Sequence, residues 1–177
     1  STYVVTGTFT TTGCSSQKNI TVSVNPKPVA NFVLPSPQCL QGNQYNFSSN
    51  SVISAGSISN LQWFADNILI GNGANINFSF TNSGNHTIKL VATSNNGCKD
   101  SISRVIEVYP NPTITIFGPA SFCTGSFITL NSTITSVGSV IDTYQWNTTS
   151  GPVSGGSNSV LQVAQPGDFH LNVSDIH

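Results

Sequence analysis

HTIKLVATSNNGCKDSISRVIEVYP, residues 86–110, contains two runs in which apolar residues alternate with polar ones. The turn residues Asn95-Asn96-Gly97 separate the two runs, and Pro110 ends the second. An apolar residue at every second position places one face of a strand against a core, whereas a helix needs a period of 3.6. We therefore predict two antiparallel strands, His86–Ser94 and Ser101–Tyr109, joined by a short turn.

The same alternation continues upstream, where Asn72-Gly73 and Ser83-Gly84 supply further turn signals. No segment of similar length has a helical period. Five more strands are predicted, at Val29–Leu34, Gln44–Ser49, Asn60–Asp66, Ile68–Gly71 and Asn75–Phe80. Seven short strands, with Trp63 on the one predicted at Asn60–Asp66, are typical of an immunoglobulin-like β-sandwich. The predicted fold class is therefore all-β.

The sequence repeats itself with a spacing of 84 residues, and of 83 over its later part. Gly13-Cys14 matches Gly97-Cys98 at the first spacing, and Gln62-Trp63 matches Gln145-Trp146 at the second. Other matched pairs are Val22 with Ile106, Val24 with Val108, Cys39 with Cys123, Gly84 with Gly167, His86 with Phe169 and Ile88 with Leu171. These matches predict tandem sandwich modules in a linear array.

Two proline-rich joints, Pro26-Lys27-Pro28 and Pro110-Asn111-Pro112, mark the predicted module boundaries. Proline fixes φ and restricts the preceding residue, so such joints are short and semi-rigid. We predict that residues 1–25 are the last two strands (F and G) of a first module and that residues 27–109 are a complete module. Residues 111–177 are expected to form a module without its last strand, as in a window cut from a longer array.

Composition excludes several classes of protein. Only 6% of the residues are charged and the net charge is −1, which argues against nucleic-acid binding and against a polybasic membrane contact. No apolar run is long enough to span a bilayer, so we expect no membrane insertion. Four Cys, no Met and few charged residues favour an exported, extracellular protein.

Two stretches resemble the PKD domain family. Phe78-Ser-Phe-Thr-Asn-Ser-Gly-Asn-His-Thr-Ile-Lys-Leu-Val resembles the end of a PKD domain, and Leu61-Gln-Trp-Phe-Ala-Asp-Asn resembles that family's Trp-x-Phe-Gly-Asp-Gly motif. Phe122-Cys-Thr-Gly, Tyr144-Gln-Trp and Gly167-Asp-Phe-His-Leu-Asn-Val are similar to an Ig-like relative found beside PKD repeats. Mixed arrays of this kind are similar to large surface adhesins of gliding bacteria that use type IX secretion, which implies location on a bacterial cell surface.

The cysteines predict cross-links, with the pairing left open. Each module carries one Cys before its second strand (Cys39, Cys123) and one in the turn between its last two strands (Cys14, Cys98). Because successive strands alternate in direction, these two positions fall at opposite ends of a sandwich, about 26 Å apart, whereas a disulfide needs Cα atoms within about 7 Å. This geometry favours bridges between neighbouring modules; a Cys39–Cys98 bridge and free thiols remain as alternatives.

No catalytic, metal or cofactor site is predicted. The carboxylates show no Asp-x-Asp spacing, Asp66 and Asp142 lie near turns, and no Gly-x-Ser-x-Gly elbow is present. His86 occupies a strand position that Phe169 fills in the next module, and His170 faces the opposite way from Phe169. We therefore expect that the chain is not an enzyme.

The aromatic residues and one serine are the remaining candidates. Trp63 and Trp146 are predicted to be core residues rather than sugar-stacking platforms. An exposed cluster among Phe117, Phe122, Phe127 and Tyr144 would instead favour glycan binding. Asp100-Ser101-Ile102 resembles an O-glycosylation signal of the same bacterial group, which implies modification of Ser101.

The expected function is that of a stalk or filament segment in a secreted multi-module adhesin, which carries tension and displays a distal binding element. Its expected partners are neighbouring modules of the same chain, with surface glycans or further copies of itself as possible additions. One alternative is a spacer or glycan-binding module of a secreted polysaccharide-degrading enzyme. Another is a sheath or matrix protein that self-associates through open strand edges.

Overall fold

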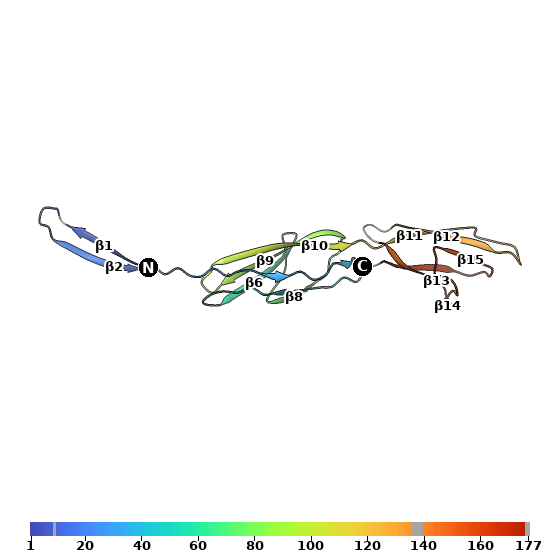
Figure 1. Cartoon of the computed structure of the whole chain (residues 1–177), viewed down its shortest axis with the longest axis horizontal. Coiled ribbons are helices and arrows are strands. Elements are labelled where there is room, and N and C mark those ends of the chain that lie inside the picture. Colours follow the sequence, from blue (N-terminus) through green and yellow to red (C-terminus); the bar gives the residue numbers. More distant parts are fainter. Residues whose placement is uncertain (9, 136–139, 176–177) are drawn as a thin grey trace.

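The computed structural model describes residues 1–8, 10–135 and 140–175. Within these ranges every regular element is a β-strand, and the strands form three groups along the long axis of the molecule (Figure 1). This confirms the prediction of an all-β protein built from sandwich modules. Among the described residues, no helix has the length and apolarity that a membrane crossing requires.

The first group is a hairpin of two strands, β1 (Thr2–Thr8) and β2 (Ser15–Thr21). The strands are antiparallel, with Thr2 opposite Thr21 and Thr8 opposite Ser15. Every residue of both strands is exposed, including Tyr3 and Ile20. The hairpin therefore contributes pairing but no core.

The second group is a sandwich of two sheets. Three strands form the first sheet, in the order β3 (Phe32–Val33), β5 (Tyr45–Ser49) and β8 (Asn75–Phe78). Five strands form the second, in the order β4 (Gln38–Cys39), β10 (Lys99–Tyr109), β9 (Gly84–Ser94), β6 (Ile58–Ala65) and β7 (Ile68–Asn72). The hairpin β9–β10 contains the two alternating runs of residues 86–110, and its pairing runs from Lys99 opposite Thr93 to Val108 opposite Gly84.

The first predicted strand of this sandwich differs from the observed one. A single strand was expected at Val29–Leu34, but only Phe32 and Val33 pair with β5, and Val29 makes one isolated bridge to Val52. The chain then crosses to the other sheet, where β4 pairs in parallel with β10. Pro35 and Pro37 lie between the two short strands, and their missing N–H groups interrupt a continuous ladder.

The core of the second group lies between its two sheets, around the fully buried Trp63. The Trp63 indole N–H donates to the Gly73 carbonyl oxygen at 2.9 Å, so its polar atom is satisfied. Phe32 meets the Trp63 ring edge-on, with ring centroids 5.1 Å apart. The buried members of this core are Phe32, Tyr45, Phe47, Trp63, Ala65, Phe80, Ile88, Leu90, Ile106 and Val108.

The third group is also a two-sheet sandwich. One sheet contains β11 (Thr113–Phe117), β12 (Ile128–Thr135) and β15 (Val160–Val163), in that order. The other contains β14 (Gly151–Pro152), β13 (Ile141–Thr148) and β16 (Phe169–Asp175). Its core surrounds the fully buried Trp146, whose indole N–H donates to the Asn158 carbonyl oxygen at 2.8 Å.

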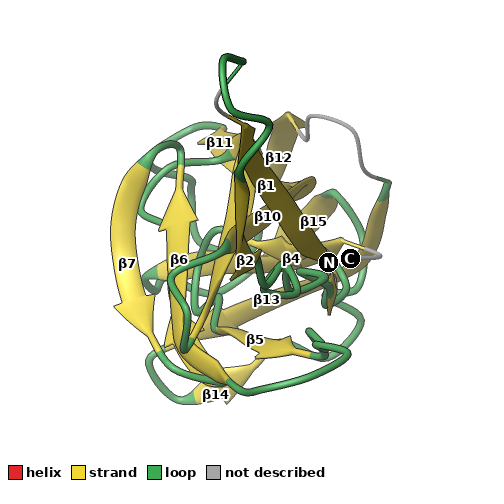
Figure 2. Ribbon diagram, turned by 90° about the vertical axis from the view of Figure 1, so that its left-hand side faces the viewer, coloured by secondary structure: helices red, strands yellow, loops and turns green. Residues whose placement is uncertain are grey.

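The three groups follow one another end to end. Figure 1 places the N-terminus at the joint between the hairpin and the second group. The last described residue, Asp175, lies at the joint between the second and third groups, where it contacts Cys39. Figure 2 looks along the long axis, and the three groups overlap one another in this view. The described strand pairs all lie within residues 2–21, 29–109 or 113–175, so no ladder crosses a joint.

Candidate functional site

The joint between the second and third groups is short and has direct polar contacts. Three residues, Pro110 to Pro112, connect the end of β10 to the start of β11. The Gln41 backbone N–H donates to Asn111 Oδ1 at 3.0 Å, which ties a loop of the second group to the linker. A cavity of ≈ 610 Å³ lies beside this contact, between the loop of the second group and the β16 strand of the third.

At this joint, the short strand β4 near the start of the second group pairs in parallel with the end of its last strand, β10. Gln38 and Cys39 of β4 lie opposite Val108 and Tyr109 of β10, and the Leu40 N–H donates to the Tyr109 carbonyl oxygen at 2.8 Å. Opposed forces on residues near 28 and near 110 pull these parallel strands past each other. The hydrogen bonds between them are then loaded together rather than one after another.

Asp100 holds the other end of the second group. Its carboxylate lies 2.6 Å from Lys27 Nζ and accepts the Ala30 backbone N–H at 2.8 Å. The ion pair with Lys27, followed by the hydrogen bond from Ala30, lowers the pKa of the Asp100 carboxyl. Asp100 therefore fastens the entering linker to the start of β10. Sequence reasoning missed this role, because Lys27 and Asp100 are far apart in the chain.

The four cysteines lie near the ends of the groups. Cys39 is at the end of the second group that faces the third, whereas Cys98 immediately precedes β10 at the opposite end, where its thiol is 3.9 Å from the Asn25 carbonyl oxygen. Cys39 lies beside Tyr109 at the far end of β10, and Cys98 precedes the first residue of this 11-residue strand. The two positions are therefore about 36 Å apart, so this structure does not accommodate the Cys39–Cys98 alternative. No disulfide is present among the described residues, and bridges between modules stay a prediction.

Cys39 also contacts the third group. Its thiol donates to Asp175 Oδ1 at 3.6 Å, across the joint. Burial, together with the negative charge of Asp175, raises the pKa of the Cys39 thiol. The thiol therefore stays protonated at neutral pH, which makes it a slow nucleophile.

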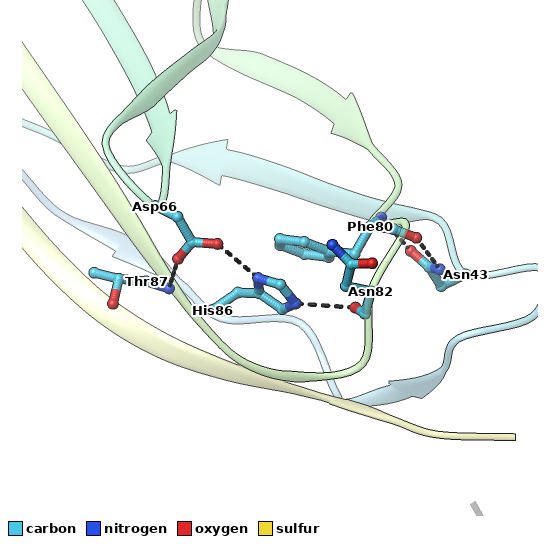
Figure 3. Close-up of polar contacts among 6 residues, drawn as sticks. All are labelled: Asn43, Asp66, Phe80, Asn82, His86 and Thr87. Atoms are coloured by element: carbon cyan, nitrogen blue, oxygen red, sulfur yellow. Dashed lines mark hydrogen bonds and ion pairs between the residues drawn. The ribbon is translucent and has the colours of Figure 1, made fainter.

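A second polar cluster, drawn in Figure 3, connects the turn between β6 and β7 to β9. Asp66 and Asn67 form this turn with φ of 48° and 69°, as a two-residue hairpin turn requires. Asp66 Oδ1 accepts the Thr87 N–H at 2.8 Å, and Asp66 Oδ2 lies 2.7 Å from His86 Nδ1. Hydrogen bonds from His86, and then from Thr87, lower the pKa of the Asp66 carboxyl.

The His86 ring lies between two acceptors. Its Nδ1 faces Asp66, and its Nε2 lies 3.0 Å from the Asn82 carbonyl oxygen. Only the doubly protonated imidazolium donates to both at once. The ring also stacks on Phe80, with centroids 4.1 Å apart, so His86 links the turn to the core. Through Asp66, the Asn82 carbonyl oxygen and the Phe80 ring, His86 joins the β6–β7 turn to the start of β9 and to the core.

The remaining sequence candidates are dispersed. Ser101 is exposed on β10 opposite Val91. The carboxylate of the neighbouring Asp100 forms an ion pair with Lys27 and accepts a hydrogen bond from the Ala30 N–H. Trp63 and Trp146 are buried, whereas Phe117 and Phe127 are 50% and 63% exposed. No group of three or more His, Cys, Asp or Glu suited to a metal ion occurs among the residues described.

Phe122 lines a cavity in the third group, and Tyr144 packs against the Trp146 core. None of the stacked aromatic pairs found in the described residues includes Phe117, Phe122, Phe127 or Tyr144. The four predicted glycan-binding candidates therefore form no stacked cluster in this structure.

No protein-family profile matches the sequence, and no curated protein does so at a significant level. Among solved structures, the N-terminal eight Ig domains of Down Syndrome Cell Adhesion Molecule align with 99% of this chain and 31% of that one, with a TM-score of 0.53 and 14% identity. The PKD1 domain of Vibrio anguillarum Epp aligns with 48% of this chain and 96% of its own, with a TM-score of 0.43 and 25% identity.

Fibronectin(III)-like modules of Clostridium thermocellum CbhA align with 84% of this chain and 86% of their own, with a TM-score of 0.39 and 14% identity. The solved structures that resemble this chain thus include PKD, Ig-like and fibronectin III-like domains. The alignment with the Ig domains extends over all three groups of strands, and it supports the Ig-like sandwich fold.

Proposed function

We propose that this chain is a stalk segment of a secreted, multi-module adhesin on a bacterial cell surface. In this proposal the modules carry tension and hold a distal binding element away from the cell, and the chain has no catalytic role. The resemblance to adhesins exported by type IX secretion in gliding bacteria suggests the same route of export. The second group is, in the same proposal, a module of the PKD type.

The observation that carries the proposal is the way in which the second group is fastened at both ends. Asp100 binds the entering linker through Lys27 and Ala30. At the exit, β4 pairs in parallel with β10. Force applied along the array therefore meets an ion pair at one end and a sheared strand pair at the other.

The composition supports the same interpretation. Only 6% of the residues are charged, so few surface contacts depend on ionic strength. In this proposal, the cysteines near both ends of the second group form covalent links to neighbouring modules, which would resist separation of the joints. A spacer in a polysaccharide-degrading enzyme would need the same mechanical properties, and a catalytic domain elsewhere in the polypeptide would identify that alternative.

The test is to locate the segment on the intact producing cell. Antibodies raised against residues 27–109 should label unpermeabilised cells, and deletion of these residues in frame should reduce attachment while the remaining protein is still exported. Labelling only after permeabilisation would refute the proposal. Loss of polysaccharide hydrolysis with attachment unchanged would favour the enzyme spacer instead.

A further inference from the structure

β8 is an open edge strand in the middle of the chain. It borders the sheet β3-β5-β8, and among the described residues no strand pairs with its second side. The Ser49 N–H donates to the Ala74 carbonyl oxygen at 2.8 Å, which fixes the phase of the hydrogen bonds between β5 and β8. Because bonded and non-bonded pairs alternate in an antiparallel ladder, the N–H and C=O groups of Asn75 and Asn77 point away from β5. They are therefore available to an added strand.

The two sides of the second group differ in how their strand edges are protected. On one side the edge strands β3 and β4 have only two residues each, and Pro35 and Pro37 lie between them. Short strands, prolines and charged side chains are the usual means by which sheets avoid edge-to-edge pairing. On the other side, which β7 and β8 border, residues 67–85 contain no proline and no Asp, Glu, Lys or Arg. This side therefore has neither prolines nor charges to prevent pairing.

β8 is the more regular of the two edge strands on this side. A register shift interrupts the pairing of β7 with β6. In contrast, β8 pairs with β5 without a shift, from Tyr45 opposite Phe78 to Ser48 opposite Asn75. Irregularities of the kind found in β7 discourage pairing at an edge. A partner strand is therefore expected at β8 rather than at β7.

β8 is complementary to a second copy of itself. With a two-fold axis at Ile76, Asn75 of each copy lies opposite Asn77 of the other, and each such pair exchanges its backbone N–H and C=O groups. Both Asn side chains are exposed on the outer face of the sheet. On β5, a hydroxyl and an amide side chain lie opposite them, from Ser48 and Asn46 respectively. Pairing of two copies therefore extends these side chains into one row of amide and hydroxyl groups, and amide rows of this kind stabilise stacked strands.

We propose that the β8 strands of two copies of this chain pair antiparallel about a two-fold axis at Ile76, so that their two sheets β3-β5-β8 become one continuous sheet. Charge does not oppose the approach, because the edge is uncharged and the net charge of the chain is −1. Both copies use the same edge, so the contact closes on a dimer. A contact of one short strand pair is small, so the association is weak. It does not depend on the proposed cell-surface role, because it uses only residues of the second group.

Charge substitutions on β8 test both the contact and its register. Sedimentation velocity of the whole chain, over about a thousandfold range of concentration up to about 1 mM, should show a dimer at the upper end. Asn75→Lys with Asn77→Lys should weaken dimerisation by about tenfold or more, because each lysine then faces a lysine of the other copy. Asn75→Asp with Asn77→Lys should dimerise at least as tightly as the unmodified chain, because each introduced carboxylate then faces an ammonium group.

Val33→Lys with Val105→Lys is the matched control for added charge. These residues are 72% and 56% exposed on β3 and β10, away from β8, so their replacement should leave dimerisation unchanged. Urea denaturation checks that every variant is folded. A chain that stays monomeric at all concentrations would overturn the proposal. Dimerisation that responds alike to the two β8 variants, or to the control as much as to them, would overturn it as well.

Amide hydrogen exchange of the unmodified chain tests the contact without any substitution. The N–H groups of Asn75 and Asn77 should exchange rapidly in dilute solution, and about tenfold more slowly at the concentration where the dimer forms. The N–H of Ile76 is the internal control, because it already bonds to β5 and should change little. Slower exchange at another edge, with none at Asn75 and Asn77, would place the contact elsewhere and overturn the proposal.

Discussion

At the residue scale, the burial of side chains that serve only the core was the easiest property to predict. Trp63 and Trp146 recur at a fixed spacing within strand-like segments, and alternation alone places them on the inner face. Asp66 and His86 were less accessible to this reasoning. The sequence indicated a turn at Asp66 and a strand at His86, but their contact depends on how β7 and β9 border β6.

Replacement of Asp66 by Asn tests this cluster. Asn tolerates the positive φ and can still accept the Thr87 N–H, but it removes the negative charge beside His86. Because the Asp66 side chain is 49% exposed, we expect a modest loss of about 0.5–1 kcal/mol in the free energy of unfolding at neutral pH. Urea denaturation measures it, with Asp142→Asn at an exposed strand position as the control.

The lowered pKa values of Asp66 and Asp100 also predict the pH dependence of stability. A carboxyl whose pKa is lower in the folded state binds fewer protons than in the unfolded state, so it stabilises the fold at pH above its ordinary value of 3.8. That contribution is lost as the pH falls through the lowered folded-state pKa. Combined Asp66→Asn and Asp100→Asn should flatten the decline in unfolding free energy in acid; an unchanged acid profile would contradict the assignment.

At the scale of elements, the strands with long alternation were predicted within a few residues. The segments now seen as β9 and β10 begin two residues earlier than predicted and end at the predicted residues. The strand predicted at Val29–Leu34 is regular only at Phe32–Val33, and the short strand Gln38–Cys39 that follows in the other sheet was not predicted. Gln38–Cys39 is too short to show a period, and its parallel partner lies at the far end of the module, so no local pattern indicates it.

The β4–β10 pair can be tested at Leu40. Leu40→Pro removes the N–H that donates to the Tyr109 carbonyl oxygen, while Leu40→Ala keeps that N–H and removes only side-chain packing. We expect Leu40→Pro to be less stable than Leu40→Ala by about 1–2 kcal/mol, and to lower the force at which the second group unfolds. Thermal denaturation of both variants gives the first comparison. Equal stability would show that the parallel pair contributes little.

At the scale of the whole molecule, the repeat was the strongest sequence signal. It predicted modules in a row, and the head-to-tail order of the groups in Figure 1 agrees with that expectation. The joints were less predictable, because contacts such as Gln41 with Asn111 and Cys39 with Asp175 join residues from different modules. Prolines mark where a joint occurs, but they do not indicate which side chains fasten it.

The cysteine placement gives a prediction at this scale. Peptide mapping of the oxidised chain under non-reducing conditions should yield no Cys39–Cys98 peptide, because the two residues lie at opposite ends of the second group. In the native full-length protein, Cys39 should be found linked to a cysteine of a neighbouring module. Recovery of a Cys39–Cys98 peptide from folded chain would contradict both the joint geometry and the proposed links.

The central claim, that the modules resist tension along the array, is tested most directly by single-molecule stretching of the chain held at its two ends. The account predicts a discrete unfolding event that releases residues 27–109, with a length gain of about 3.3–3.6 Å for each residue less the folded length. The force of this event should fall in Leu40→Pro and stay near the unmodified value in Leu40→Ala. Gradual extension at low force, without a discrete event of that length, would contradict the claim.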